Sequence, residues 1–294
     1  MRRRNAFTVV VATDGSPAAI AAVATTLAFP WPARTGVSGV VARRTTATAG
    51  RPGYVLAAWD RHWARVAASA TRALAHRWPD AEVLIVDDTP ADAVLAEAKR
   101  RDADVVVIGW RGHGAFRRFV MGSVSREVVR RAEVPVVVTR RRPREMKRIV
   151  VGYDGSPSAR HAVDLLARLA PPRGGQITVA TVAEPVNAPS LALMPGGVRD
   201  VLRREAVALE SERMTAAERA LKAPVARLEA AGWKVRTAVR CGAPLAELLD
   251  VVATAGANLL AVGSRGNNAV ERFVLGSVAE GAINHARVTV LVTP

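Results

Sequence analysis

Residues 105–140 read VVVIGWRGHGAFRRFVMGSVSREVVRRAEVPVVVTR, and residues 259–294 read LLAVGSRGNNAVERFVLGSVAEGAINHARVTVLVTP. Both stretches run in the same order, from an apolar run through a glycine-rich segment and a helical pattern to a second apolar run. A constant separation of 154 residues relates them over all 36 positions. Because order and spacing are kept throughout, we interpret the stretches as two copies of one unit.

A second pair of matching segments lies near the start of each copy. TVVVATDGSP (8–17) matches RIVVGYDGSP (148–157), with six identities in ten positions and a separation of 140 residues. The chain is therefore one domain duplicated, and the second copy carries fourteen extra residues between its two matching blocks. The copies meet in the charged segment RRRPREMK (140–147), which we interpret as a solvated linker. The predicted domains are 1–142 and 143–294.

Each copy alternates short apolar runs with helical patterns. Continuous apolar runs are typical of parallel strands that are covered on both faces. Five strands alternating with four helices predict a doubly wound α/β domain with a five-stranded parallel sheet in each copy. The predicted strands are 7–13, 36–42, 81–86, 104–109 and 134–139 in the first copy, and 147–153, 176–183, 234–240, 258–263 and 288–293 in the second.

Prolines and serines mark the predicted helix starts. Ser16-Pro17 and Ser156-Pro157 supply an N-cap and a first-turn proline for the first helix of each copy. The second helices cover 54–77 and 198–231, and Pro224 must kink or break the latter. We place the fourteen extra residues within 184–233, where they alter a surface and leave the sheet unchanged. The remaining helices are predicted to begin at Pro90, Ser123, Pro244 and Ser277.

Composition excludes several classes of protein. Of the 294 residues, 50% are apolar and 23% are charged, which excludes a disordered chain and leaves material for buried cores. The longest mostly apolar stretch, 18–31, is too short to span a bilayer. Cys241 is the single cysteine, so we expect a cytoplasmic protein without disulfides. We interpret the net charge of +16 as an arginine-rich solvated surface, with polyanion binding as the alternative and nucleic-acid binding disfavoured.

Two features of each copy are predicted to meet at the carboxyl edge of its sheet, where ligands bind in open parallel folds. The first is an acid after strand one, Asp14 or Asp154, and the second is a glycine loop after strand four with the spacing G-x2-G-x9-G-S. The last glycine of that loop begins a helix, whose free N–H groups favour a phosphate. Since a carboxylate repels phosphates, we expect the acid at the base and ribose end of a nucleotide. Recurrence in both copies favours a shared ligand.

These motifs, D-G-S-P after strand one and the glycine loop after strand four, resemble the ATP-binding, tandem-domain form of the universal stress protein family over essentially the whole chain. The resemblance implies an adenine nucleotide alpha hydrolase-like fold and ATP, with or without Mg²⁺, in each domain. It also implies that the acid and the backbone at the end of strand two hold adenine and ribose, and that the glycine loop holds ribose and phosphates. In the first copy the implied residues are Ala12, Asp14, Val41, Gly109, Arg111, Gly112, His113, Gly122, Ser123, Val124 and Ser125. In the second they are Gly152, Asp154, Val182, Gly263, Arg265, Gly266, Asn267, Gly276, Ser277 and Val278.

The second copy departs from the first at two loop positions. It has Ala279 where the first has Ser125, and Asn267 where the first has His113, so it offers one fewer hydroxyl to a phosphate or its metal. Neither loop contains a lysine, and the chain has no G-x4-G-K-[ST] motif. We therefore assign no catalytic residue and no metal ligand, and expect slow hydrolysis at most; a general base at His113 is the alternative. The loop arginines, either phosphate clamps or surface residues, are Arg111, Arg118, Arg265 and Arg272.

The final apolar strand of each copy would be hazardous as a bare sheet edge. In the family these strands pair domain to domain, so the resemblance implies that 134–139 lies against 288–293 within the chain. Association of two chains into a homodimer stays open.

The favoured hypothesis is a cytoplasmic stress-response protein that binds ATP in each domain and signals by its bound state. Three alternatives remain. One is an interaction module with a vestigial nucleotide site, which recruits a partner through 184–233 and the basic surface. The others are a polyanion-binding protein and a phosphotransferase.

Overall fold

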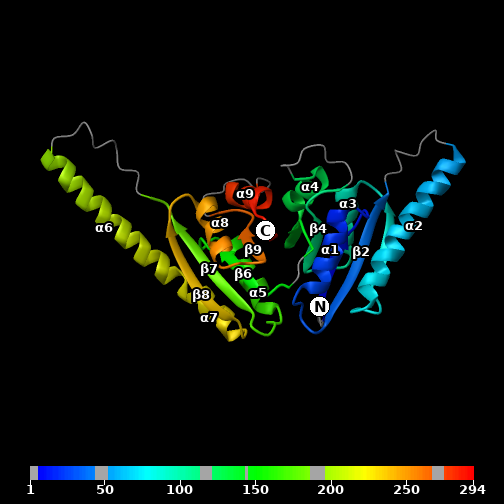
Figure 1. Cartoon of the computed structure of the whole chain (residues 1–294), viewed down its shortest axis with the longest axis horizontal. Coiled ribbons are helices and arrows are strands. Elements are labelled where there is room, and N and C mark those ends of the chain that lie inside the picture. Colours follow the sequence, from blue (N-terminus) through cyan, green and yellow to red (C-terminus); the bar gives the residue numbers. More distant parts are fainter. Residues whose placement is uncertain (1–5, 44–51, 113–120, 143–144, 186–195, 267–274) are drawn as a thin grey trace.

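The structure is a computed structural model that describes residues 6–43, 52–112, 121–142, 145–185, 196–266 and 275–294. Its strands form one ten-stranded sheet in the order β3-β2-β1-β4-β5-β10-β9-β6-β7-β8 (Figure 1). The first half contains β1 (Phe7–Ala12), α1 (Pro17–Ala28), β2 (Thr35–Arg43), α2 (Gly53–Ala75), β3 (Glu82–Asp87), α3 (Pro90–Arg100), β4 (Val105–Gly109), α4 (Ser123–Arg131) and β5 (Val136–Thr139). The second contains β6 (Arg148–Gly152), α5 (Pro157–Arg168), β7 (Gln176–Ala183), α6 (Gly196–Ala220), α7 (Lys222–Ala230), β8 (Lys234–Cys241), α8 (Pro244–Thr254), β9 (Leu259–Gly263), α9 (Ser277–His285) and β10 (Thr289–Thr293).

Each half is a doubly wound five-stranded domain, which confirms the predicted fold class. Within each half all neighbouring strands are parallel, and the first strand lies between the second and the fourth. The strand order therefore reverses between β1 and β4 and again between β6 and β9. Such reversals open a crevice beyond the carboxyl ends of the two strands, because the connections leave them on opposite faces.

The predicted capping residues explain where several helices begin. The Ser16 hydroxyl accepts the Ala19 N–H, and the Ser156 hydroxyl accepts the Ala159 N–H, each just before a first-turn proline. The break expected near Pro224 is present but lies upstream of it, because α6 ends at Ala220 and α7 begins at Lys222. Pro224 then lies in the first turn of α7, where its missing N–H breaks no helical hydrogen bond.

Strand register locates the fourteen extra residues. Ser38 lies opposite Glu82 across β2 and β3, and Thr178 lies opposite Arg236 across β7 and β8. Ser38 and Thr178 are separated by 140 residues, whereas Glu82 and Arg236 are separated by 154. The fourteen extra residues therefore all lie between β7 and β8. It lengthens the connection there into α6 and α7, and α6 extends away from the sheet at one end of the molecule (Figure 1).

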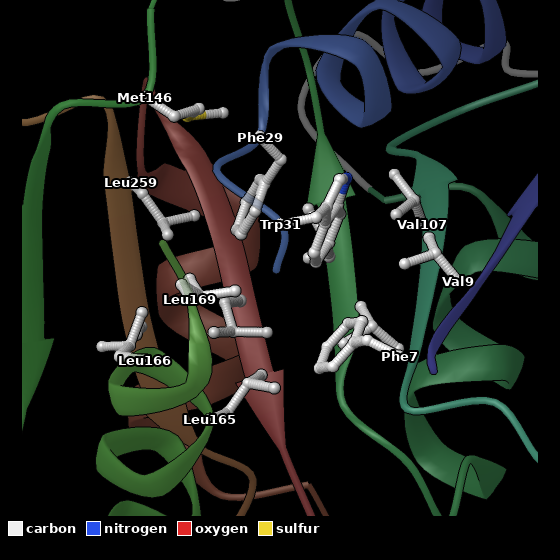
Figure 2. Close-up of a cluster of buried hydrophobic side chains, with 14 of the residues drawn as sticks. Phe7, Val9, Phe29, Trp31, Val107, Met146, Leu165, Leu166, Leu169 and Leu259 are labelled. Atoms are coloured by element: carbon white, nitrogen blue, oxygen red, sulfur yellow. The ribbon is translucent and has the colours of Figure 1, made fainter. Parts of the chain in front are cut away.

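The two halves share their sheet and their core. β5 and β10 pair antiparallel, with Val137 opposite Leu291, which is the pairing that the family resemblance implies. Apolar side chains from both halves form one buried layer on each face of the sheet. Figure 2 shows Phe29 and Trp31 between the two halves, and their rings stack with centroids 4.2 Å apart. The Trp31 Nε1–H donates to the Thr26 carbonyl at 2.8 Å, so this buried indole is satisfied.

No helix in the described part of the chain is long and apolar enough to cross a membrane. The predicted boundary between residues 142 and 143 adjoins a pair of residues outside the described ranges, and it stays a prediction.

Glu97 is a buried carboxylate on α3 whose ion pairs contribute to stability. Burial opposes its ionisation, but hydrogen bonds from Arg100 (2.7 Å) and Arg101 (3.0 Å) prevail and hold the pKa of Glu97 below its ordinary value. A lowered folded-state pKa stabilises the protein above the ordinary pKa, and this contribution is lost as pH falls through the folded-state value. We expect Glu97→Gln to lower the free energy of unfolding by about 2 kcal/mol at pH 7.

Urea denaturation at pH 7 and at pH 3 measures this prediction. The deficit of Glu97→Gln relative to the unsubstituted protein is expected to shrink at the lower pH. Glu127→Gln is the matched control, because Glu127 pairs with Arg131 on the surface with 49% of its side chain exposed. An equal deficit at both pH values would refute the role assigned to the ionised carboxylate.

Candidate functional site

A cavity of about 500 Å³ lies at the carboxyl ends of β1 and β4, at the point where the strand order reverses. Its volume is within the range of small-molecule sites in proteins. Side chains and backbone from four helices and three strands line it. The lining residues are Ala12, Thr13, Asp14, Ala19, Val40, Ala42, Trp59, Trp63, Pro90, Val94, Ile108, Gly109, Arg111, Gly112, Gly122, Ser123, Val124 and Ser125.

The turn after β1 orients the acid at one side of this cavity. The Ser16 N–H donates to Asp14 Oδ1 at 2.9 Å, and Gly15 has the positive φ of +77° that the turn requires. Asp14 Oδ2 faces the glycine loop, where a Cβ added to Gly112 would lie 2.5 Å from it. A glycine at position 112 therefore lets the loop backbone pass close to the carboxylate.

The second domain repeats this arrangement. The Ser156 N–H donates to Asp154 Oδ1 at 2.9 Å, and a Cβ added to Gly266 would lie 3.0 Å from Asp154 Oδ2. Both domains thus bring the acid of the first strand against the second glycine of the loop. The acid and the glycine that recur in the sequence therefore also recur with the same geometry.

The first and third glycines of the loop serve packing within the domain. A Cβ on Gly109 would lie 2.7 Å from the Ala18 backbone of α1, so β4 and α1 approach as closely as glycine permits. The Gly122 N–H donates to the Trp110 carbonyl at 3.0 Å, and the Gly276 N–H donates to the Ser264 carbonyl at 2.7 Å. These two hydrogen bonds close the loop, so the N–H groups of Gly122 and Gly276 already have acceptors within the protein.

Ser125 makes a hydrogen bond within the first domain. Its hydroxyl donates to the Gly109 carbonyl at 2.7 Å and is buried, so its proton ties α4 to the end of β4. Ala279 takes the same place in the second domain, which therefore lacks this tie. The exchange of Ser125 for Ala279 therefore removes a hydrogen bond within the loop of the second domain.

The fourth helix of each domain begins without a side-chain cap from any described residue. Gly122 and Gly276 hold the N-cap positions of α4 and α9, whereas Ser16 and Ser156 cap α1 and α5 with their hydroxyls. The first turn of α4 borders the cavity, because Ser123 and Val124 line it. Such a terminus carries partial positive charge and attracts anions. In α9 the corresponding first positions are Ser277 and Val278.

Arg111 adds positive charge to the cavity, and a second arginine packs on the same tryptophan ring. Arg111 lines it, with its guanidinium carbon 4.0 Å from the Trp110 ring centroid. The Arg140 guanidinium lies 3.7 Å from the same centroid and donates to the Ile283 carbonyl of α9 at 2.6 Å. Burial and the neighbouring charges of Arg111 and Arg141 lower the pKa of Arg140 to about 10. In the second domain, the Arg265 carbonyl accepts the Ser158 hydroxyl at 2.6 Å.

The end of β2 lies at the cavity. The side chain of Val41 is fully buried in the layer that contains Phe7, so the ligand contact that the family resemblance implies for this residue would be made by its backbone. Val40 and Ala42 line the cavity, and they alternate with Val41 along the strand. Val182 is the equivalent of Ala42 and packs in the same layer as that residue. The roles of Val41 and Val182 stay predictions.

Some residues singled out in the sequence lie outside the described ranges: His113, Asn267, Arg118 and Arg272. Others that line the cavity were missed. Trp59 and Trp63 are the largest of these, and their spacing of four residues in a predicted helix was a signal that both face one side. Thr13, Ala19, Pro90, Val94 and Ile108 were missed as well. Among the described residues, no three His, Cys, Asp or Glu side chains gather as metal ligands.

Comparison with known proteins assigns the chain to a family. The fold and its paired crevices define a tandem α/β domain protein. The sequence model of the universal stress protein family matches residues 6–140 and 145–294, and the chain belongs to that family. Universal stress protein Rv2005c of Mycobacterium tuberculosis is 32% identical over 214 residues, which cover 71% of this chain and 67% of that protein. A universal stress protein from Mycolicibacterium smegmatis is 35% identical over 139 residues, 46% of each chain.

Solved structures show the same fold over the whole chain. A universal stress protein from Archaeoglobus fulgidus superposes with a TM-score of 0.64 and 18% identity, and 97% of each chain is covered. The protein PA1789 from Pseudomonas aeruginosa superposes with a TM-score of 0.59 and 12% identity over 98% of this chain. At these identities the likeness concerns the fold, including its tandem duplication.

Proposed function

We propose that this protein binds ATP in each of its two crevices and acts in the stress response as a nucleotide-dependent regulator. The observation that supports the proposal is the polarity of the first cavity. An uncapped helix N-terminus and Arg111 lie on the β4 side, while Asp14 lies on the β1 side. A molecule with a negative end and a neutral, hydrogen-bonding end fits this polarity.

The two ends suit the two parts of a nucleotide. We propose that the N–H groups of Ser123 and Val124, in the first turn of α4, donate to phosphate oxygens, which the helix dipole further favours. Asp14 would accept hydrogen bonds from ribose hydroxyls, and its charge would repel phosphates bound beside it. The apolar side chains of Val40 and Ala42 give the same side a surface for a base.

The proposal extends to the second domain, because the carboxylate, the glycine approach and the uncapped helix recur there. ATP with or without Mg²⁺ is the proposed ligand of both sites. We assign no catalytic residue, and slow hydrolysis stays a prediction. The cytoplasmic location and a homodimer of the whole chain also stay predictions.

The small molecules carried by the purified chain test this proposal. The protein is denatured, and the released molecules are identified by mass spectrometry and counted per chain. We expect an adenine nucleotide, or else apoprotein that gives a calorimetric binding signal when ATP and magnesium are added. A chain that carries no nucleotide and gives no such signal would count decisively against the proposal.

A second candidate function has one observation in its favour. The arm formed by α6 exposes Val198 (49%) and Val207 (66%), together with Val201 and Leu209. An interaction module with a vestigial nucleotide site would use such a surface to recruit a partner. Substitution of both Gly122 and Gly276 by glutamate separates the candidates, since a vestigial site predicts unchanged cellular function and the nucleotide-dependent regulator predicts its loss.

The salt dependence of binding tests the third candidate, polyanion binding through the arginines. Binding of a polyanion such as heparin through the basic surface would weaken steeply with the logarithm of salt concentration. A flat response removes this alternative. A phosphotransferase would show multiple turnover that His113→Ala abolishes.

A further inference from the structure

Two tryptophans form one side of the first cavity. Trp59 and Trp63 both line it, and a spacing of four residues places them on one face of α2. Both are half-buried. Both rings therefore present part of their apolar surface to the cavity.

The packing of α2 fixes these rings at the carboxylate side of the cavity. Val66, one turn from Trp63, lies so close to the turn after β1 that a Cβ on Gly15 would be 2.8 Å from its Cγ2. Gly15 follows Asp14 directly, and α2 packs on β2 and β3. The tryptophans therefore lie on the side of the cavity formed by the turn after β1 and the end of β2.

The second domain has no equivalent rings. Leu74 and Leu228, both fully buried, are 154 residues apart, as are the buried Ala67 and Leu221, so the same separation aligns α2 with α6 and α7. This separation makes Arg213 the sequence equivalent of Trp59, and Ala217 the equivalent of Trp63. The Arg213 guanidinium donates to the Glu184 carbonyl just beyond β7. The two crevices thus share their phosphate side and differ on their other side.

We propose that Trp59 and Trp63 form an aromatic platform that stacks on a planar ring, so that the first-domain site selects for a nucleobase while the second-domain site discriminates less. The inference rests on the proposed nucleotide binding and names the residues that give that binding its ring specificity. Stacking is tolerant of base identity because every base has a π-face. The platform therefore discriminates strongly between a ligand with a base and a ligand without one, and only weakly between different bases.

Binding of ATP and of inorganic tripolyphosphate by the full chain tests the platform. A Gly276→Glu background restricts binding to the first domain. Against that background, Trp59→Ala and Trp63→Ala are each expected to weaken ATP binding about tenfold, since removing a stacking partner has an effect of this order. Tripolyphosphate, which has the phosphates without the ring, should bind these variants and the parent equally.

Two further variants control the experiment. Trp63→Phe keeps a ring and should retain ATP affinity within about threefold. Trp78→Phe removes a tryptophan that lies beyond the C-terminal end of α2, away from the cavity lining, and should change neither affinity. Thermal unfolding of each variant checks that the fold persists, and the two single alanine variants test the platform independently, so either one decides if the other fails to fold.

The outcomes are distinguishable. Equal ATP affinity in the parent and in the alanine variants, with ATP bound, would refute the platform and leave the proposed function standing. Equal losses for ATP and tripolyphosphate would also refute it, because stacking cannot act on a ligand without a ring. A parent protein that binds neither ligand would refute the proposed function and this inference together.

Discussion

Replacing Gly122 by glutamate is expected to abolish ATP binding at the first site while the fold persists. The carboxylate would enter the space in front of the first N–H groups of α4, where we place the phosphates. Like charges in direct juxtaposition cost several kcal/mol, so affinity should fall at least about 100-fold. Gly122 has a φ of −62°, which any residue adopts, and a negative charge at a helix N-terminus is favourable in itself. A Cβ at this position would lie 3.3 Å from the Arg111 Cα, a contact that glutamate and glutamine variants share.

Calorimetric titration with ATP and magnesium measures this loss. Gly122→Gln is the matched control, because it adds a side chain of the same size without the charge. Gly276→Glu makes the same change in the second domain, so each single variant should lose one binding equivalent and the double variant both. Unaltered stoichiometry in the glutamate variants would show that the helix N-termini hold no phosphates.

Removal of the Asp104 carboxylate is expected to produce the largest loss of stability. Asp104 Oδ1 accepts a hydrogen bond from Arg168 of α5 at 2.8 Å, and Oδ2 accepts the Thr8 N–H at 2.8 Å. Its side chain is 3% exposed. The contact joins the start of β4 in the first domain to the last turn of α5 in the second, beside the ring of Phe7. Asp104→Ala leaves a buried amide and a guanidinium without this acceptor, and should lower the free energy of unfolding by about 3 kcal/mol.

Urea denaturation of the full chain gives this value. Asp104→Asn keeps an acceptor for Thr8 and should lose less. Arg131→Ala is the surface control, since Arg131 pairs with Asp92 where both side chains are about 40% exposed or more, and such pairs contribute under about 1 kcal/mol. If Asp104→Ala were no more harmful than Arg131→Ala, the contact would contribute nothing to holding the domains together.

Much of this fold could be predicted from the sequence because local and global signals agree. Strands buried on both faces need long apolar runs, and each observed strand overlaps a predicted run to within two residues at either end. Serine and proline pairs fixed the starts of α1 and α5. The duplication fixed the topology of one half from the other. The upstream position of the break before α7 was missed, because Pro224 fits a first turn as well as it breaks a helix interior.

The candidate site was predictable in its backbone and less so in its side chains. The glycines and acids were found because they recur, and the structure brings Asp14 against Gly112 and Asp154 against Gly266. Which face each side chain of β2 takes could not be predicted, because β2 is buried on both faces and its apolar pattern carries no information on the face.

The tryptophans were missed for a different reason. Their place at the cavity depends on how α2 packs on the turn after β1, a tertiary contact between Val66 and Gly15 that no local pattern contains. The same applies to the use of the Ser125 hydroxyl within the loop.

The most direct test of the account is an experimental structure of the chain crystallised with ATP and magnesium. We predict triphosphate density within hydrogen-bonding distance of the Ser123 and Val124 amides, and of the Ser277 and Val278 amides in the second domain, with the ribose beside Asp14 and Asp154. A well-ordered structure from saturating nucleotide with both helix N-termini empty would contradict it.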